Sequence, residues 1–140
     1  EDLGQYEKAL EDFSESIRLD PNHAKAYNTR GLSYRKSGQN ERAIEDYNEA
    51  IRLDPDDAYA YSNRAGTYGV LGQYEKVIKD STKAINLDPD FAPRYYLRGL
   101  AYEDLGQYEK AIKDYTKSIY LDPEYELALK HKKLLLAKIN

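Results

Sequence analysis

A period of 34 residues runs through the sequence and is marked by two separate motifs. The hexapeptide Leu-Gly-Gln-Tyr-Glu-Lys occurs at 3–8, 71–76 and 105–110, and a diverged copy, Ser-Gly-Gln-Asn-Glu-Arg, occurs at 37–42. A second motif, Leu-Asp-Pro, keeps the same spacing and ends at Pro21, Pro55, Pro89 and Pro123. Two motifs that share one period of this length indicate an array of structural repeats, in which each unit buries its apolar face against its neighbours.

The composition is that of a folded chain with a distributed core. The 140 residues have the length of one ordinary domain, and a repeat array needs no large central core. Fifteen tyrosines argue against disorder, because disordered segments are poor in aromatic residues. The absence of cysteine excludes disulfides and thiolate metal sites. No apolar run approaches the roughly 18 residues of a membrane span, and no export signal is visible, so we predict no membrane association and a cytoplasmic location.

We interpret the chain as one domain, 1–140, made of repeated units. Each whole unit predicts two helices, because small and apolar residues recur at helical spacing in both of its halves. The hexapeptide glycine breaks the first helix, and Asp-Pro ends the second, since proline disfavours the α conformation in the preceding residue. The fold class is therefore all-α, built from antiparallel helix-turn-helix hairpins. The predicted divisions are a half unit at 1–23, whole units at 24–57, 58–91 and 92–125, and a capping helix at 126–140.

Small residues mark the middle of every predicted helix. In the last whole unit Tyr95, Gly99 and Tyr102 stand at positions i, i+4 and i+7, which form one face of a helix. Gly31 and Ala65 are the residues equivalent to Gly99. Facing small residues allow two helices to approach closely, with tyrosines filling the space between hairpins, so Gly99→Leu should overpack the core. The small residues of the second helices are Ala9, Ala43, Val77 and Ala111.

The complete pattern, Tyr-x3-Gly/Ala-x2-Tyr-x3-Gly-x-Tyr-x2-Ala-x3-Tyr-x2-Ala/Ser-x4-Pro, resembles the tetratricopeptide repeat over residues 1–125. The resemblance implies a right-handed α-solenoid of helical hairpins. It also implies that the first helices line a concave groove and that the second helices form the convex face. Three positions depart from the pattern, since Asn40 and Ser81 replace aromatic residues and Val77 replaces alanine.

The two ends of the array differ. The helix predicted at 5–19 lacks a preceding partner, which leaves the face of Tyr6, Ala9 and Phe13 half uncovered. We interpret this end as a fragment of a longer array, and the uncovered helix is also a candidate for self-association. In the tail, Leu129 and Leu136 take the tyrosine positions, and Lys133 takes the place of the small residue. A lysine there opposes close approach of another helix, so we interpret the tail as a solubilising cap.

Arginine and aspartate also repeat with the 34-residue period. Arg30, Arg64 and Arg98 precede the small residue of each first helix. A partly buried guanidinium group favours a carboxylate partner, so we predict an internal arginine–aspartate ladder. Two questions stay open: whether each arginine meets the aspartate of its own or of the preceding hairpin, and whether the arginines instead bind a ligand. The repeating carboxylates are Asp12, Asp46, Asp80 and Asp114.

Charge is segregated between the two kinds of helix. Residues 24–37, 58–71, 92–105 and 126–140 carry eleven Lys and Arg against three Asp and Glu, whereas the remainder of the chain has a net charge of −12. A relatively basic groove would steer an acidic partner inward. The alternative explanation is that these are ordinary solvated helix faces combined with the internal ladder.

Helix geometry selects the side chains that should line the groove. The candidate peptide-binding residues are Lys25, Asn28, Leu32, Arg35, Tyr59, Ser62, Asn63, Gly66, Gly69, Tyr96, Leu100 and Glu103. Gly66 and Gly69 each cost about 0.5–1 kcal/mol relative to Ala inside a helix. They predict a hollow, flanked by tyrosines and leucines, for the apolar anchor of an extended peptide whose acidic end lies near Lys25 and Arg35. Sequence drift or close helix packing would equally account for the glycines.

The second unit, with Tyr-Ser-Asn-Arg at 61–64, is also similar to the middle repeat of chaperone-binding clamp domains, which grip a C-terminal carboxylate with five residues. Only Asn63 matches that set. The remaining clamp positions, which are Lys, Asn, Lys and Arg in those domains, hold here Asn28, Leu32, Pro93 and Leu97. We therefore expect no carboxylate clamp of that type.

The sequence gives little support for catalysis. His23 and His131 share no metal-ligand spacing, adjacent acidic pairs such as Glu11 and Asp12 are typical of solvated helices, and no phosphate-binding glycine loop is present. We predict no enzyme activity, no cofactor and no metal. A net charge of −4 also argues against a nucleic-acid partner.

Three hypotheses of function remain. The first is a non-catalytic scaffold that holds a peptide or helix of a protein partner in the concave groove. The second is a self-associating structural solenoid segment. The third is a regulatory fragment of a larger protein.

Overall fold

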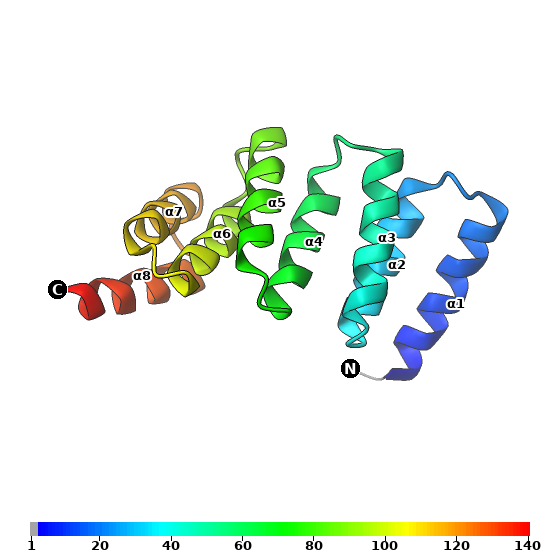
Figure 1. Ribbon diagram of the computed structural model, residues 1–140, viewed down its shortest axis with the longest axis horizontal. Coiled ribbons are helices and arrows are strands. Elements are labelled where there is room, and N and C mark those ends of the chain that lie inside the picture. Colours follow the sequence, from blue (N-terminus) through cyan, green and yellow to red (C-terminus); the bar gives the residue numbers. More distant parts are fainter. Residues whose placement is uncertain (1–2) are drawn as a thin grey trace.

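The computed structural model describes residues 3–140, which form eight α-helices and no β-strand (Figure 1). The first helices of the whole units end at Lys36, Val70 and Asp104, because the residue before the turn glycine is the C-cap. Residues 1 and 2 of the predicted half unit lie outside the described residues. The helices are α1 (Leu3–Leu19), α2 (Ala24–Lys36), α3 (Asn40–Leu53), α4 (Ala58–Val70), α5 (Tyr74–Leu87), α6 (Ala92–Asp104), α7 (Tyr108–Leu121) and α8 (Glu126–Ile139).

The helices form a right-handed α-solenoid, as the resemblance to the tetratricopeptide repeat implies. Each helix packs against its neighbours in sequence, so the array runs from α1 at one end to α8 at the other (Figure 1). The first helices of successive hairpins also contact each other, α2 with α4 and α4 with α6. The first helices therefore form a continuous layer of their own, and we call its outer surface the groove face.

Each hairpin turn of the whole units closes on a glycine in the left-handed region. In the first turn the Gln39 N–H donates to the carbonyl of Tyr34 at 2.8 Å, and the Gly38 N–H donates to the carbonyl of Arg35 at 3.0 Å. This pair of bonds is the Schellman motif, which satisfies the last carbonyls of a helix and requires a residue with positive φ. The glycines and their φ angles are Gly38 (83°), Gly72 (73°) and Gly106 (76°).

Within two hairpins a glycine accommodates the ring of a tyrosine. A Cβ added to Gly99 would lie 2.6 Å from Cε1 of Tyr115, and one added to Gly31 would lie 2.7 Å from Cε1 of Tyr47. Both tyrosines are fully buried against the glycine of their own hairpin. Each also reaches the following helix, Tyr47 toward Thr67 of α4 and Tyr115 toward His131 of α8, so these rings fill space between hairpins as well. The middle hairpin has Ala65 and Ser81 at these two positions. Alanine, which is larger than glycine, thus occurs together with serine, which is smaller than tyrosine.

Burial raises the pKa of the hydroxyl group of both tyrosines. Desolvation raises the pKa of Tyr47 to about 12, and the Tyr47 hydroxyl lies near Thr67 without a well-formed hydrogen bond in the described part of the chain. Burial, followed by a hydrogen bond to Glu103, also raises the pKa of Tyr115. The Tyr115 hydroxyl donates to Oε1 of Glu103 at 2.8 Å.

The arginine ladder is present and joins each arginine to the aspartate of its own hairpin. Arg98 donates from Nε and Nη2 to the two carboxylate oxygens of Asp114, both at 2.8 Å. Its Nη1 donates to Thr82 of the preceding hairpin at 3.1 Å. Each arginine therefore bridges three helices, which answers the first question that the sequence left open. The equivalent sets are Arg30 with Asp46 and Ser14, and Arg64 with Asp80 and Asn48.

The ends of the array are less covered than its middle. None of the described residues of α1 is buried; Ala9 and Phe13 are half-buried, whereas their counterparts in α3 and α7 are fully buried. On α8, Ala128 and Leu135 are buried and Lys133 is exposed. A solubilising cap would have a uniformly polar outer side. On α8, however, four apolar side chains remain exposed: Leu127 (49%), Leu129 (42%), Leu134 (57%) and Ile139 (42%).

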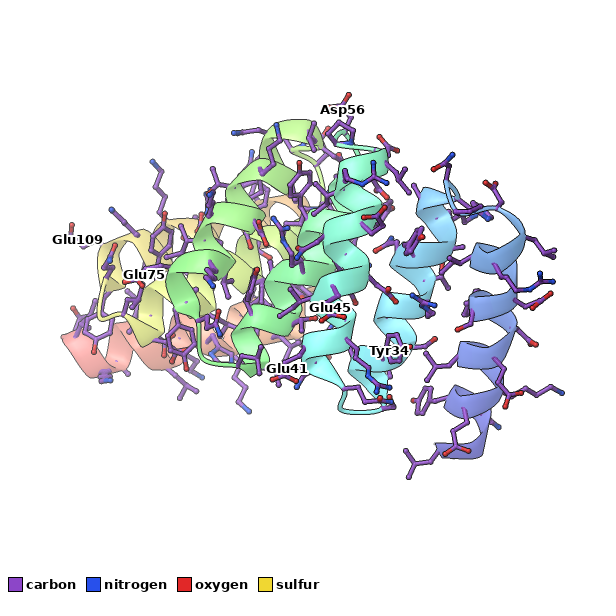
Figure 2. The ribbon with its side chains drawn as sticks, turned by 45° about the vertical axis from the view of Figure 1, so that its right-hand side comes forward. Tyr34, Glu41, Glu45, Asp56, Glu75 and Glu109 are labelled. Atoms are coloured by element: carbon purple, nitrogen blue, oxygen red, sulfur yellow. The ribbon has the colours of Figure 1, made fainter. Side chains whose placement is uncertain are left out.

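The second helices carry exposed carboxylates. Glu41 and Glu45 of α3, Glu75 of α5 and Glu109 of α7 are all exposed, and Figure 2 shows them along the array. Three of the four occupy the same position of successive repeats. These four glutamates of the second helices are therefore solvated, unlike the buried aspartates of the ladder.

The glycine–tyrosine pair yields a prediction about packing energy. Gly99→Ala should destabilise the protein by about 1–3 kcal/mol, because its methyl group would overlap the Tyr115 ring. In a Tyr115→Ser background the same change should cost clearly less, because the double variant reproduces the Ala65 and Ser81 pair. Urea unfolding of the four proteins measures the difference, and strictly additive free energies of unfolding would contradict this packing account.

Candidate peptide-binding groove

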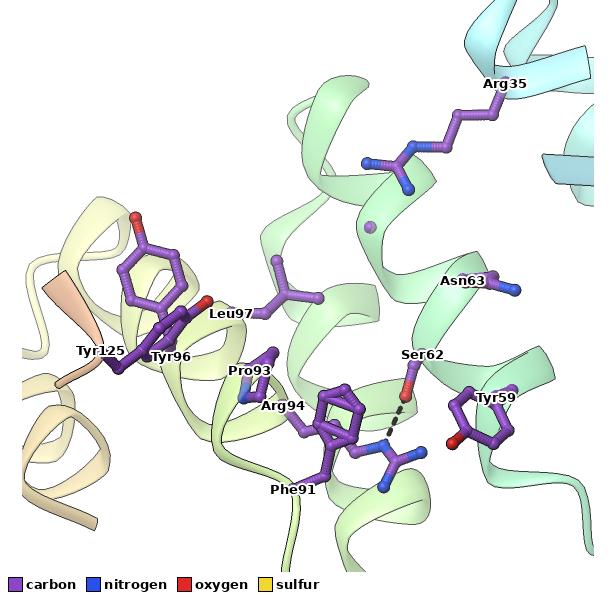
Figure 3. A pocket seen from close by; sticks show the side chains of 11 residues that line it. Arg35, Tyr59, Ser62, Asn63, Phe91, Pro93, Arg94, Tyr96, Leu97 and Tyr125 are labelled. Atoms are coloured by element: carbon purple, nitrogen blue, oxygen red, sulfur yellow. Dashed lines mark hydrogen bonds between the residues drawn. The ribbon is translucent and has the colours of Figure 1, made fainter. Parts of the chain in front are cut away.

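A cavity of about 310 Å³ opens on the groove face between α4 and α6 (Figure 3). Helix α4 contributes Tyr59, Ser62, Asn63 and Gly66, and α6 supplies most of the opposite wall. The N-cap residues of α6 and α8, Phe91 and Tyr125, close two corners. The lining residues are Arg35, Tyr59, Ser62, Asn63, Gly66, Phe91, Pro93, Arg94, Tyr96, Leu97 and Tyr125.

A second cavity, of about 270 Å³, adjoins the first and shares Gly66 and Leu97 with it. Its walls come from α4, α5 and α6, and they are mainly apolar. The two cavities together form a trough along α4. The second lining is Gly66, Gly69, Val70, Tyr74, Val77, Leu97, Leu100, Ala101 and Asp104.

The two helical glycines of α4 serve different purposes. A Cβ on Gly66 would lie 3.2 Å from Nη1 of Arg35, so the guanidinium group of α2 rests on the bare backbone of α4. At Gly69 the nearest atom to an added Cβ is Cγ2 of Val77, at 3.8 Å. The predicted hollow therefore exists, but Arg35 occupies part of it.

The structure brings six of the predicted residues to the first cavity and adds two more at the second. Arg35, Tyr59, Ser62, Asn63, Gly66 and Tyr96 line the first, and Gly69 and Leu100 join Gly66 in the second. Four predicted residues lie elsewhere. Lys25 lies in a separate hollow beside Phe13 of α1, away from Arg35. Leu32 is half-buried and lines neither cavity.

Two further predicted residues are engaged with other side chains. Asn28 accepts a hydrogen bond from Nδ2 of Asn63 at 3.1 Å, which links α2 to α4. Asn63 is also the single residue that matches the clamp pattern, and this bond uses its amide. Glu103 accepts from the Tyr115 hydroxyl, so its carboxylate supports the hairpin core.

Tyr96 is both a cavity residue and a packing residue. Its ring lies 6.0 Å from that of Tyr115, 5.4 Å from that of Tyr125 and 5.5 Å from that of His131, measured between centroids. Burial raises the pKa of Tyr96. Only one side of its ring therefore remains available to a ligand, and removing the ring would also disturb the contact between α6 and α8.

Sequence reasoning missed Arg94, Phe91, Leu97 and Tyr125 as cavity residues. Arg94 is only 3% exposed, although it is charged. A signal was present in the repeat alignment, because the positions equivalent to Arg94 hold alanine in every other first helix. Those alanines are Ala26, Ala60 and Ala128, and all are buried.

Within residues 3–140 there is no group of three or more His, Asp or Glu residues that could hold a metal ion. In the same range no helix combines the length and the apolar character that crossing a bilayer requires.

Family models match most of the chain. A model described as "TPR repeat" matches residues 2–36 and 31–72, and models described as "Tetratricopeptide repeat" match residues 58–91 and 92–125. Comparison with curated protein sequences gave no match.

Solved structures of similar fold cover most of this chain. A crystal structure of MamA is 26% identical, with a TM-score of 0.83 over 96% of this chain and 89% of MamA. The first TPR of Spaghetti (RPAP3), bound to the HSP90 peptide SRMEEVD, is 27% identical, with a TM-score of 0.81 over 83% of this chain and 92% of that chain. The second TPR domain of human RPAP3, in complex with the HSP70 peptide SGPTIEEVD, is 33% identical, with a TM-score of 0.77 over 80% of this chain and 93% of that chain.

The glycines of the trough yield a prediction about stability. Gly69→Ala should raise the free energy of unfolding by about 0.5–1 kcal/mol, because alanine favours the helix and the added methyl group meets no close neighbour. Gly72→Ala is the matched control and should lower stability, since Gly72 has a φ of 73°. Thermal unfolding measures both, and a loss of stability in Gly69→Ala would show that the glycine is needed for packing.

Proposed function

Because the chain belongs to the tetratricopeptide repeat family, we propose that it is a non-catalytic interaction module that holds an acidic peptide segment of a protein partner against α4 and α6. The observation that carries this proposal is the cavity between these helices. Its lining combines aromatic rings with two arginines, and it contains no carboxylate among the described residues.

The size and lining of the cavity suit a side-chain anchor. A volume of about 310 Å³ lies at the lower end of the range for ligand sites. Tyr59 is 58% exposed and offers an aromatic surface that a partner can cover. The adjoining apolar cavity extends the trough along α4, which is the shape that an extended segment requires.

Two similar structures support a peptide as the partner. Both RPAP3 domains are bound to peptides that end in Glu-Glu-Val-Asp, and such peptides are acidic. The present chain has Asn28, Leu32, Pro93 and Leu97 where a carboxylate clamp has other residues, so we do not transfer the position of those peptides. What we transfer is the class of partner.

A pull-down with purified protein as bait tests the proposal. The groove variant Arg35→Glu with Tyr59→Ala should lose proteins that wild type captures, because it reverses a charge and removes an exposed ring at the cavity. The control variant, Lys113→Glu with Tyr120→Ala, makes the same changes on α7 and should keep them. Equal capture by the two variants would exclude the groove face as the binding surface.

A second candidate function is self-association through the uncovered ends. It is favoured by α1, where Phe13 is half-buried, and by the exposed Leu129 and Leu134 of α8. The charge change Leu134→Lys should then lower the molar mass that light scattering reports at high protein concentration. A wild-type protein that stays monomeric at every concentration would remove this candidate.

A further inference from the structure

Arg94 is among the most buried charged residues in the part of the chain that the structure describes. It replaces an alanine of the repeat and is nearly as buried as the alanines it replaces, at 3% exposure. A guanidinium group withdrawn from water requires acceptors for its N–H groups. Its surroundings therefore indicate whether its donors are fully used.

Three of the five N–H donors of Arg94 have partners. Nε donates to Oγ of Ser62 at 2.7 Å, and Nη1 donates to the side chain and to the carbonyl of Asp88, at 2.8 and 3.2 Å. Nη2 is buried and has no hydrogen-bond acceptor anywhere in residues 3–140. Two N–H donors of a buried cation are thus left over in a residue that lines the cavity.

Two aromatic rings hold the guanidinium group in place. Cζ of Arg94 lies 4.8 Å from the ring centroid of Phe91 and 5.3 Å from that of Tyr59, and Figure 3 shows the group between these rings. The two rings meet edge to face, with centroids 6.3 Å apart. Tyr59 is 58% exposed, so its ring forms the solvent-facing side of this arrangement.

A second cation lies one turn away along α4. Arg94 contacts Ser62, and the guanidinium group of Arg35 rests on Gly66. Four residues of an α-helix advance by about 6 Å, so the two points at which these groups contact α4 lie about that distance apart. Arg35 makes no hydrogen bond or ion pair within residues 3–140 and is therefore also available.

The two contact points on α4 are spaced like alternate side chains of an extended peptide. Side chains two residues apart on an extended chain point to the same side and are separated by about 6.6 Å. We propose that Arg94 and Arg35 read two acidic side chains of the bound peptide, in an acidic-x-acidic pattern along α4. One carboxylate accepts from Nη2 of Arg94 and the other from Arg35. This inference rests on the proposed function and specifies the peptide that the site selects.

Fluorescence anisotropy with short peptides tests the pattern. The probe is the labelled decapeptide Gly-Ser-Gly-Leu-Glu-Ser-Glu-Gly-Ser-Gly, whose amidated end removes the C-terminal carboxylate. One comparison peptide has both Glu residues changed to Gln, and another has the two Glu residues adjacent in the same composition. We expect each comparison peptide to bind at least tenfold more weakly than the probe.

Two protein variants complete the experiment. Arg94→Ala restores the residue of the other repeats and should fold, which a thermal melt checks, and Arg35→Gln changes a side chain that rests on the helix surface. Each should weaken probe binding at least tenfold. The proposal is overturned if the Gln peptide binds wild type equally well, if the folded Arg94→Ala keeps full affinity, or if the probe does not bind.

The pull-down separates this inference from the proposed function. If partner capture depends on the groove face but the probe binds no better than the comparison peptides, the acidic pattern is rejected and the interaction module remains supported. If probe binding depends on Arg94 but the groove variant and its control capture partners equally, the interaction module is rejected. The binding site for acidic side chains at Arg94 is then still supported.

Discussion

Every whole hairpin of this protein depends on one arginine that reaches three helices. Arg98 closes its own hairpin through two bonds to Asp114 and ties that hairpin to the preceding one through Thr82. The carboxylates are buried and the guanidinium groups are only partly exposed, so these bonds are shielded from the solvent that weakens surface ion pairs. Removing one partner leaves a buried charge, which makes the ladder a condition for stacking hairpins as well as a contribution to stability.

Repetition explains the architecture, and departures from repetition locate the candidate site. The turn glycines, ladder residues and tyrosines recur every 34 residues, and their contacts recur with them. Arg94, Gly66 and Tyr59 break the pattern and meet at one cavity between α4 and α6. A residue that is costly for the fold in only one repeat is a better indicator of a binding surface than one that is costly in all of them.

The hairpins, their turns and the ladder could be predicted because they depend on local spacing and on residue types that repeat. The partner of each arginine could not, because the aspartates of two hairpins were equally available in sequence. Arg35 was predicted to line the groove, and it does, but the sequence did not reveal that its guanidinium group rests on Gly66. Tyr96 and Glu103 stand at helical positions that face the groove, but both also contact residues of other helices. Tyr96 packs against Tyr115 and His131, and Glu103 accepts a hydrogen bond from Tyr115, and these contacts could not be predicted from helical position alone.

The cavity lies across the junction of two hairpins, with walls from α4 on one side and α6 on the other. In a linear array, cooperativity is carried by the interfaces between adjacent units, and a weak interface allows one end to unfold while the other persists. A ligand seated on both sides of one junction adds to the coupling at that interface alone. The location of the cavity thus links ligand binding to the cooperativity of unfolding. A ligand bound across this junction favours unfolding of the two halves of the solenoid as one unit.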